Sequence, residues 1–350
     1  KAASRFCIGL GISIPVGKDS LSMRTNWTEA GEKKTVTSPV SLIVSAAAPV
    51  TNAALTLTPE LRRGKGVDKS VLVLVDLGQG KNRMGGSILA QTTQRFGDEA
   101  PDCEDPALLG RFITALRKLE LAGCVLAYHD RSDGGLFAAA AEMNFASRIG
   151  IRLDLSSLLQ EKGATVLNTL FNEELGALIQ IPADRTEEVV AQMRAFGLSH
   201  CCHFVGELLE EDKLEIVREG EVLASFPRAE LQSAWTEVSH EIARGRDNPE
   251  CADQEFAAVA DELNKGLFAK TTFDVDEDVA LPMINTGVRP KIAILREEGV
   301  NSQTEMAAAF TRAGFEAWDV HMTDLLSGRL NLADFKGLAA CGGFSYGDVL

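Results

Sequence analysis

The stretch YHDRSDGGL at residues 128–136 places carboxylates, a hydroxyl group and two glycines directly after an apolar run. Residues 124–128 predict a buried strand that would deliver Asp130, Ser132 and Asp133 to its carboxyl end. The glycine pair predicts a helix N-terminus, so that amides for an anion would lie beside carboxylates for a cation. This combination suits a magnesium-bound nucleotide. The alternative is structural, with Ser132 or Asp133 capping the helix and Asp130 in a turn.

A second candidate is the stretch GISIPVGKDS at residues 11–20. It is not a P-loop, because Ile12 stands five places before its second glycine and Asp19 follows Lys18. A magnesium-bound nucleotide can also be held by another geometry, with the carboxylate of Asp19 on the metal and the ammonium group of Lys18 on a phosphate. The alternative is a solvated turn.

Three further groups of residues are weaker candidates. Gly85-Gly86-Ser87 predict either an anion site at a helix N-terminus or close packing of a helix on the preceding strand. The second group is Asn172-Glu173-Glu174, which either supplies a carboxylate to a site or forms a solvated loop. His129 has a position suited to acid–base chemistry, but a single histidine at a strand end is more often structural.

The stretch CGGFSYGD at residues 341–348 also follows an apolar run. Its glycines, Gly342 and Gly343, can turn backbone N–H groups toward a developing oxyanion. Cys341 precedes the turn, and we expect it to be an inert buried thiol. The cluster at residues 200–203, with two histidines and two cysteines, does not favour a metal site, because neighbouring side chains of a strand point to opposite faces.

Several elements can be predicted around these residues. Residues 41–44 and 71–75 predict strands buried on both faces, and residues 175–181 predict a further strand. One helix is bounded by Asp105 as its cap and by Gly123 as its stop. The other predicted elements are a helix that starts with a capping box of Asp184 and Glu187, a hairpin that turns at Glu219-Gly220, and a helix with an apolar stripe of Leu231, Trp235, Val238 and Ile242.

The composition becomes acidic and weakly patterned at residues 248–287, which predicts a linker with a short helix across residues 255–264. A new alternation of strands and helices begins at Lys291, where Ser302 and Glu305 predict a capping box. This is the opening of a doubly wound domain, and its roughly 60 residues are fewer than the usual 100 or more. We therefore predict a multidomain α/β and α+β protein whose last domain is incomplete here.

The composition restricts the class of protein. The 350 residues are 45% hydrophobic and carry a formal charge of -15, which disfavours nucleic-acid and anionic-membrane partners. No apolar stretch approaches the length of a membrane span. The seven cysteines follow no disulfide framework and predict reduced, cytoplasmic thiols. The sequence begins with Lys1 and without the apolar core of a signal peptide, so we expect an excised fragment.

Five stretches taken together, PVGKDSLSM, MGGSILAQ, HDRSDGGL, FNEELGALI and CGGFSYGDVL, resemble the phosphoribosylformylglycinamidine synthases, which are also called formylglycinamide ribonucleotide amidotransferases. The resemblance is to the large single-chain form and spans nearly the whole chain. It implies that residues 1–60 end an aminoimidazole-ribonucleotide-synthetase-like N-terminal half. Residues 61–247 would be the C-terminal half, residues 248–287 the acidic linker, and residues 288–350 the start of a class I glutaminase.

The resemblance also implies roles for residues. Asp130 would bind Mg²⁺, with Asp133 and Asp19 as further metal candidates, and Ser132, Lys18 and Ser20 would contact the nucleotide. Gly342 and Gly343 would lend oxyanion-hole amides, while the glutaminase cysteine, histidine and glutamate would lie beyond Leu350. The implied cofactors are Mg²⁺ and ATP or ADP. The implied partners are formylglycinamide ribonucleotide, glutamine and the remaining domains of the same polypeptide.

In the family, ATP activates the amide oxygen of formylglycinamide ribonucleotide, and ammonia from glutamine displaces the phosphate. The family has one catalytic and one structural nucleotide site, and the sequence does not assign the HDRSDGG stretch to either. Two alternatives remain. Related ATP-using enzymes of the superfamily make selenophosphate or thiamine diphosphate, but they carry no glutaminase. The second alternative is a non-catalytic segment that holds a nucleotide and docks other domains.

Overall fold

The computed structural model describes residues 1–17, 23–38, 42–64, 69–97, 99–264, 266–267 and 269–344. The chain divides into two compact units, Lys1–Asn264 and Lys265–Leu350. Among the described residues, none of the helices combines the length and the apolar character needed to cross a bilayer.

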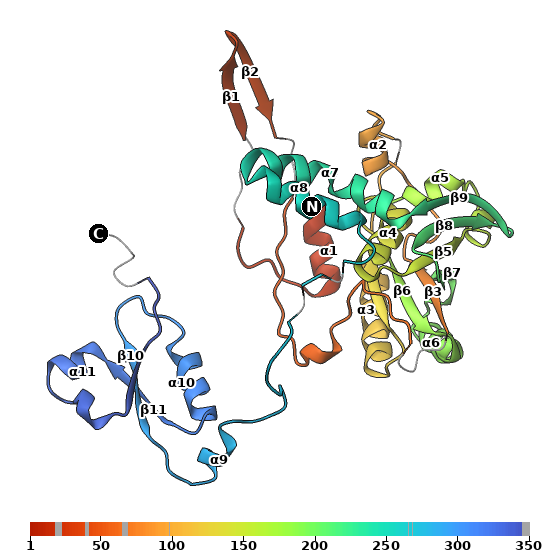
Figure 1. Ribbon diagram of the computed structural model, residues 1–350. Coiled ribbons are helices and arrows are strands. Elements are labelled where there is room, and N and C mark those ends of the chain that lie inside the picture. The colour runs from red at the N-terminus through yellow and green to blue at the C-terminus, as the bar shows by residue number, and fades with distance from the viewer. Residues whose placement is uncertain are drawn as a thin grey trace. The chain divides into compact units, whose positions relative to one another are not determined.

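The first unit is organised around one twisted sheet with the strand order β4-β6-β3-β7-β5-β8-β9 (Figure 1). All neighbouring strands are antiparallel except β5 and β8, which are parallel. The strands are β3 (Ser70–Asp76), β4 (Ala127–Asp130), β5 (Gly150–Asp154), β6 (Gly176–Pro182), β7 (Cys202–Leu209), β8 (Lys213–Arg218) and β9 (Glu221–Pro227). The predicted strands at residues 71–75 and 175–181 are thus two neighbouring interior strands of this sheet, β3 and β6.

Helices cover both faces of the sheet. The helices of the unit are α1 (Ala2–Leu10), α2 (Ile88–Thr92), α3 (Pro106–Leu121), α4 (Gly135–Ser147), α5 (Val166–Phe171), α6 (Thr186–Ala195), α7 (Arg228–Arg246) and α8 (Pro249–Ala260). Short 3₁₀ turns are η1 (Ala53–Leu55), η2 (Leu158–Gln160), η3 (Ala183–Arg185) and η4 (Ser199–Cys201).

The strand β3 is buried on both faces because its side chains alternate between two cores. Leu72 and Leu74 pack with residues of α4 and α5, whereas Val73 and Val75 pack with residues of α3 and α6. Successive side chains of a strand point to opposite faces, so an uninterrupted apolar run is what such a position requires.

Two predicted local signals are confirmed. Asp105 caps α3 and accepts a hydrogen bond from the Ala107 amide at 3.0 Å, with Pro106 in the first turn. Glu219 and Gly220 join β8 to β9, and both have positive φ, at 51° and 82°. Two left-handed residues give the turn a twist that matches the twist of the flanking strands.

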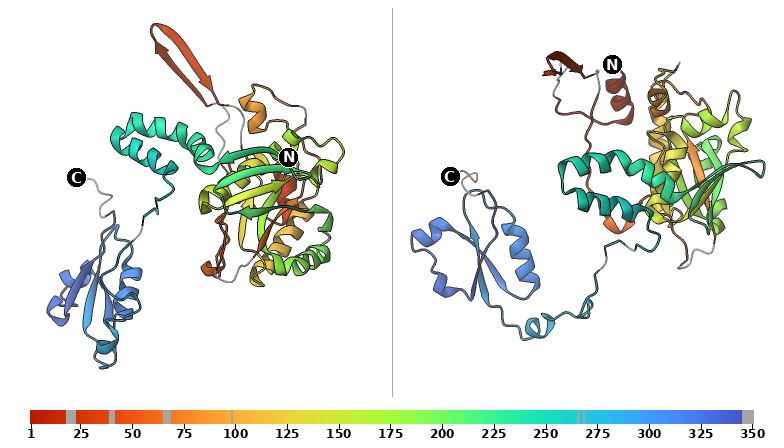
Figure 2. Two further views of the ribbon diagram at one scale, coloured as in Figure 1. Left: turned by 45° about the vertical axis from the view of Figure 1, so that its right-hand side comes forward. Right: turned by 45° about the horizontal axis from the view of Figure 1, so that its top comes forward.

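Three predicted elements are corrected. The capping box of Asp184 and Glu187 does not form, because the turn η3 precedes α6 and no side chain caps that helix. Residues 42–44 form no strand and are exposed, and no described strand pairs with them; Ser41 lies outside the described residues. The helix with the apolar stripe does form, as α7, but the stripe is mostly solvent-exposed, with Trp235 64% and Val238 69% exposed, and α8 packs against another part of α7 (Figure 2).

The helix expected at residues 255–264 begins earlier. Asn248 caps α8 by accepting hydrogen bonds from the amides of Glu250 and Cys251, and Pro249 occupies the first turn. The ring of Phe256 stacks on His240 of α7 with a centroid distance of 4.3 Å. A packed helix therefore lies inside the segment for which the acidic composition predicts a linker.

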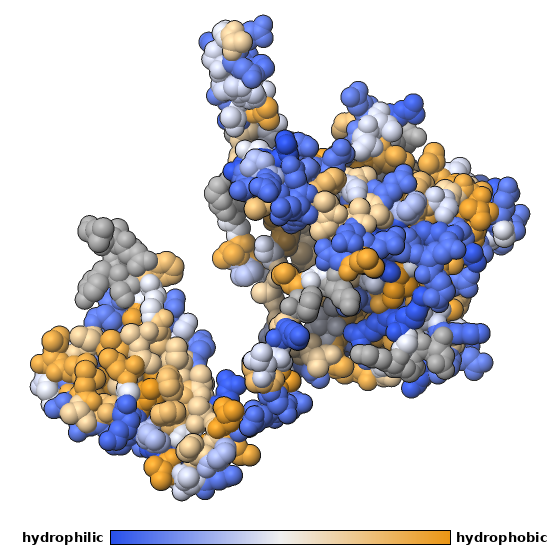
Figure 3. All heavy atoms as spheres, in the orientation of Figure 1, coloured by the Kyte–Doolittle hydropathy of each residue, from blue (hydrophilic) through white to orange (hydrophobic). Residues whose placement is uncertain are grey.

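The remaining part of the first unit is a hairpin of β1 (Arg24–Glu29) and β2 (Glu32–Thr37). Every residue of these two strands is exposed. Apolar side chains are visible at the surface of both units in Figure 3.

The second unit contains a parallel sheet with the order β11-β10-β12. Its elements are α9 (Leu281–Ile284), β10 (Lys291–Arg296), α10 (Gln303–Arg312), β11 (Glu316–His321), α11 (Met322–Leu326), η5 (Leu332–Asp334) and β12 (Gly337–Ala340). This is the strand pattern expected of a doubly wound domain. The predicted capping box at Ser302 is wrong, because Ser302 has a left-handed backbone and caps no amide with its side chain.

Candidate functional site

The HDRSDGG stretch connects the end of β4 to the start of α4. Gly134 is the N-cap of α4, with a φ of 80°, and no side chain caps the helix. The side chains of Ser132 and Asp133 are exposed and form no hydrogen bond within the described residues. The structural alternative, in which one of them caps the helix, is therefore not what the structure shows. Both side chains are free to meet a ligand.

Asp130 lies at the exposed end of β4 and pairs with Ala177 of β6. Burial and then the nearby Asp130 carboxylate raise the pKa of Tyr128 above its ordinary value. His129 is bonded on both ring nitrogens: Nδ1 lies 2.8 Å from the Asp130 carbonyl oxygen and Nε2 lies 2.7 Å from Glu142 Oε2. These bonds favour a structural role for His129.

A buried ion pair lies beneath this loop. Arg131, only 4% exposed, pairs with Asp76 at the end of β3, which is 5% exposed. The guanidinium group of Arg131 also donates to the carbonyl oxygens of Glu174 at 2.6 Å and Leu175 at 3.1 Å. Asp76 in turn accepts hydrogen bonds from the Gly78 and Gly80 amides at 3.1 and 2.7 Å. The pair thus ties together the loops that follow β3 and β4.

Burial raises the pKa of Asp76, but the Arg131 guanidinium, the Gly80 amide and His203 together lower it by more. The net result is a pKa below the ordinary value. Asp76 is therefore a permanent anion of this site at neutral pH.

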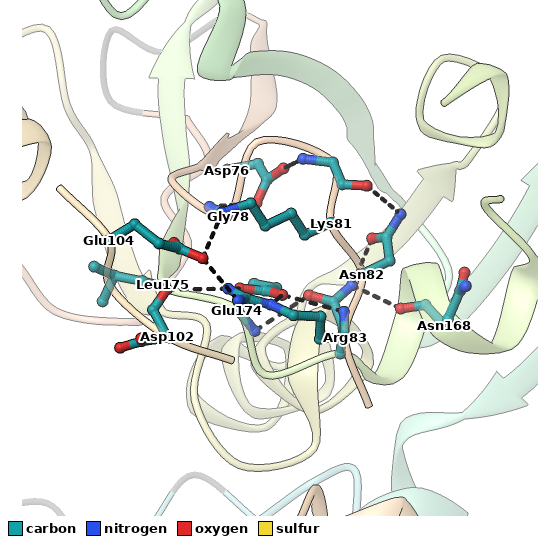
Figure 4. Close-up of polar contacts among 12 residues, drawn as sticks. Asp76, Gly78, Lys81, Asn82, Arg83, Asp102, Glu104, Asn168, Glu174 and Leu175 are labelled. Carbon is teal, nitrogen blue, oxygen red and sulfur yellow. Dashed lines mark hydrogen bonds and ion pairs between the residues drawn. The ribbon is translucent and has the colours of Figure 1, made fainter. Parts of the chain in front are cut away.

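A second ion pair joins Arg83 to Glu174 (Figure 4). Glu174, 1% exposed, receives two parallel hydrogen bonds from the Arg83 guanidinium at 2.6 and 2.8 Å. The bond to Glu174 raises the pKa of Arg83, and Arg83 also pairs with Glu104 at 2.8 Å. The hydrogen bond that Lys81 donates is the largest cause that lowers the pKa of Glu104 to about 2, and a backbone hydrogen bond and Arg83 also lower it. Bidentate geometry of this kind fixes orientation as well as charge.

In the predicted anion site at residues 85–87, close packing requires a glycine at position 85, whereas the Cβ position of Gly86 is open. A Cβ on Gly85 would lie 2.5 Å from the carbonyl carbon of Glu99. The amides of Gly85, Gly86 and Ser87 donate to backbone carbonyls, at 2.6, 2.8 and 3.2 Å. The loop therefore presents none of these three amides to an anion. Ser87 caps the short helix α2 by accepting a bond from the Ala90 amide.

The remaining predicted residues fall in two places. Lys18, Asp19 and Ser20 lie outside the described residues. Gly342 and Gly343 lie after β12, and an antiparallel bridge joins Gly343 to Val300. The flanking bonds of that bridge run from Asn301 N to the Gly342 oxygen and from Phe344 N to the Gly299 oxygen. Among the described residues, the amides of Gly342 and Gly343 themselves have no acceptor, so both are available.

No metal cluster is assembled in the part of the chain that the structure describes, since no three His, Cys, Asp or Glu side chains are arranged to hold an ion there. This includes the cluster at residues 200–203. Burial raises the pKa of Cys201 to about 12, with Cys202 as a lesser cause, and burial raises the pKa of Cys202 to about 11. The Sγ atom of Cys202 lies 3.4 Å from the Leu198 carbonyl oxygen.

These thiols are expected to resist alkylation. At pH 8 a thiol with a pKa near 11 is roughly one part in a thousand thiolate, and the thiolate is the nucleophile. Iodoacetamide followed by mass spectrometry should label the exposed Cys251 first and leave Cys201 and Cys202 unlabelled until the protein is denatured. Equal labelling of Cys202 and Cys251 in the folded protein would contradict this expectation.

The sequence did not single out Asp76, Arg83 and Arg131 as residues of the site. Asp76 carried one usable signal, because it follows a buried strand just as Asp130 does. Arg131 lies inside the HDRSDGG stretch without a local sign of its role, and the sequence favours Glu174 only weakly. Their partners lie 43 to 91 residues away along the chain, which no local pattern reveals.

Three family models match consecutive parts of the chain. The FGAR-AT PurM_N-like domain matches residues 1–49, and the C-terminal domain of AIR synthase related proteins matches residues 70–219. The CobB/CobQ-like glutamine amidotransferase domain matches residues 289–350. In this order the three matches support a fragment of a phosphoribosylformylglycinamidine synthase. The resemblance seen in the sequence is confirmed, and so is the fold class, an AIR-synthase-like unit followed by the start of a glutaminase.

Solved structures similar to this chain include two from Thermotoga maritima. One, phosphoribosylformylglycinamidine synthase II, is 13% identical over 78% of this chain and 37% of that one, with a TM-score of 0.42. The other, PurL complexed with FGAR, is 14% identical over 65% and 36%, also with a TM-score of 0.42.

A more distant match is the E. coli hydrogenase maturation protein HypE, 20% identical over 44% of this chain and 49% of that one, with a TM-score of 0.31. Scores of this size carry no argument about the site. This chain spans little more than a third of the length of the two Thermotoga proteins.

Proposed function

We propose that this chain is part of an ATP-dependent amidotransferase of purine biosynthesis. The enzyme would convert formylglycinamide ribonucleotide, glutamine and ATP to formylglycinamidine ribonucleotide, glutamate, ADP and phosphate. The observation that supports this most is the order of the three matched domains, with an AIR-synthase-related unit followed by a glutaminase opening. The related phosphotransferases of the superfamily carry no glutaminase domain, so the glutaminase opening of this chain argues against them.

The nucleotide would bind at the loop between β4 and α4. Ser132 offers an exposed hydroxyl group, and Asp130 and Asp133 offer exposed carboxylates. Two carboxylates fit Mg²⁺, which uses few protein ligands and retains several waters. When bound, Mg²⁺ would offset the charge of the transferring phosphoryl group. Lys18, Asp19 and Ser20 are proposed to join this site, Asp19 as a metal ligand and the other two as nucleotide contacts.

The second unit would contribute to glutamine hydrolysis. Gly342 and Gly343 follow the parallel strand β12, and their amides, which have no acceptor among the described residues, would donate to an oxyanion. The nucleophile and its partners would come from other parts of the polypeptide, which would also supply the remaining domains. Seven unpaired cysteines support a reducing, cytoplasmic location.

Gly343→Ala is expected to lower glutaminase activity of the complete enzyme by about a hundredfold or more, the size of effect of losing one oxyanion donor. Gly343 has a φ of 140°, and a Cβ there would lie 2.3 Å from the Gly299 carbonyl oxygen, so the turn must shift. Glutamate release measures the effect. ATP-dependent synthesis with free ammonia should persist.

Gly328→Ala is the matched control for this substitution, since Gly328 also has positive φ, at 74°, but open space around its Cβ position. Equal glutaminase activity in Gly343→Ala and wild type would remove the oxyanion assignment.

The proposed reaction is tested with the complete purified enzyme. Formylglycinamidine ribonucleotide should appear only when the ribonucleotide substrate, ATP and either glutamine or ammonia are present, with one ADP formed per product. Nucleotide binding without any turnover would instead support the non-catalytic alternative, a segment that holds a nucleotide and docks other domains.

A further inference from the structure

Three segments that are distant in sequence meet at one oxygen atom. Glu173 Oε1 accepts a hydrogen bond from the Gly134 amide at 2.9 Å and another from the Ile88 amide at 2.8 Å. Gly134 is the N-cap of α4 and belongs to the HDRSDGG loop, while Ile88 opens α2 after the Gly85-Gly86-Ser87 loop. One carboxylate therefore joins the two glycine loops that the sequence marked as anion sites.

The position of Glu173 is fixed by its neighbours. Asn172 and Glu174 are each 1% exposed, and Glu174 is held by Arg83 from one side of the segment. Asn172 donates to the Asn168 carbonyl oxygen at 2.6 Å and accepts from the Glu174 amide at 3.2 Å. With both neighbours buried, the half-buried side chain of Glu173 projects toward the two loops.

The same segment also sets the next residue of the loop. Gly135 has a φ of 67°, and a Cβ there would lie 2.5 Å from the Asn172 carbonyl oxygen and 2.6 Å from that of Leu170. The loop backbone is thus held by close packing at Gly135 and by Glu173 at Gly134. Ser132 and Asp133, directly before these glycines, have no side-chain bond of their own among the described residues. Their placement depends on the backbone that follows them.

We propose that Glu173 is the positioning residue of the nucleotide site, acting through its two amide hydrogen bonds rather than through contact with the ligand. The proposal rests on the proposed nucleotide-binding role of the HDRSDGG loop. It explains why the loop holds its shape without a capping side chain. It also assigns a role to Glu173, for which the sequence predicts either a carboxylate of a site or a residue of a solvated loop.

The test compares Glu173→Ala with Glu173→Gln in the complete enzyme. Glutamine keeps an oxygen that can accept both bonds and removes only the charge, whereas alanine removes both bonds. Titration with ADP and Mg²⁺ should show affinity about ten- to a hundredfold lower for Glu173→Ala and within about threefold of wild type for Glu173→Gln. Glu187→Ala, which changes an exposed glutamate of α6, is the control and should bind like wild type.

Hydrogen exchange separates this inference from the nucleotide assignment. Exchange at the Gly134 and Ile88 amides should accelerate in Glu173→Ala and remain slow in Glu173→Gln, with or without nucleotide. Unchanged exchange in Glu173→Ala, or a Glu173→Gln variant that loses affinity as fully as Glu173→Ala, overturns the positioning role. Absence of nucleotide binding in the wild type overturns the proposed function, while the exchange result still decides the role of Glu173.

Discussion

Replacing Arg131 with alanine is expected to lower the free energy of unfolding of the AIR-synthase-like unit by about 3–5 kcal/mol, the cost typical of breaking a buried ion pair. The reason is that Asp76 would keep a buried charge without its partner, and the Glu174 and Leu175 carbonyls would each lose a donor. Hydrogen exchange at the amides of β3 and β6 measures the loss within this unit of a multidomain protein.

The matched control is Arg117→Ala. The exposed Arg117 pairs with Glu120 three residues away on α3, and i,i+3 pairs of an exposed arginine contribute less than about 1 kcal/mol. A change in Arg131→Ala as small as that of the control would mean that the pair is not structurally important.

The same ion pair predicts how stability responds to acid. The folded-state pKa of Asp76 is lowered, so its contribution is fully present above the pKa of the unfolded chain, roughly pH 4. It is lost as the pH falls below that value through the folded pKa. The midpoint of acid unfolding should therefore move to higher pH in Arg131→Ala. Circular dichroism followed between pH 2 and 6 would show no such shift if Asp76 were protonated in the folded protein.

Asp130→Asn is expected to weaken nucleotide binding by about tenfold or more when Mg²⁺ is present, because an amide is a poorer metal ligand than a carboxylate. In the absence of Mg²⁺ the variant and the wild type should bind alike. Calorimetric titration of the complete enzyme with ATP, with and without the metal, gives both numbers. Asp133→Asn should have a smaller effect in the same direction.

A matched control for the charge change is Asp184→Asn, which removes an exposed carboxylate at the turn before α6. If Asp130→Asn retained wild-type affinity with Mg²⁺, Asp130 would not be a metal ligand of the bound nucleotide.

The parts of the fold with strong local signals could be predicted from sequence. The apolar run of β3, the Asp105 cap and the Glu219-Gly220 turn each depend on neighbouring residues only, and each was identified correctly. The exposed face of α7 and the absence of a strand at residues 42–44 could not be predicted. An apolar stripe shows that a surface can be buried but not whether a partner covers it.

The candidate site likewise has one part that can be predicted from sequence and one part that cannot. The exposed residues proposed as ligands, Asp130, Ser132 and Asp133, share one short stretch, so their joint chemistry can be predicted from the sequence. The groups that hold this stretch in place come from other segments, as the pairing of Arg131 with Asp76 across 55 residues shows. Only tertiary structure brings such pairs together.

The order of strands in the sheet has a consequence for biosynthesis. β3 pairs with β6 and β7, which follow it by about one hundred residues and more. At a translation rate of about 5–20 residues per second, β3 leaves the ribosome roughly 5–20 s before its first partner. During that time its Val-Leu-Val-Leu-Val run is an unpaired, aggregation-prone segment of the nascent chain, and chaperones are the natural protection for it.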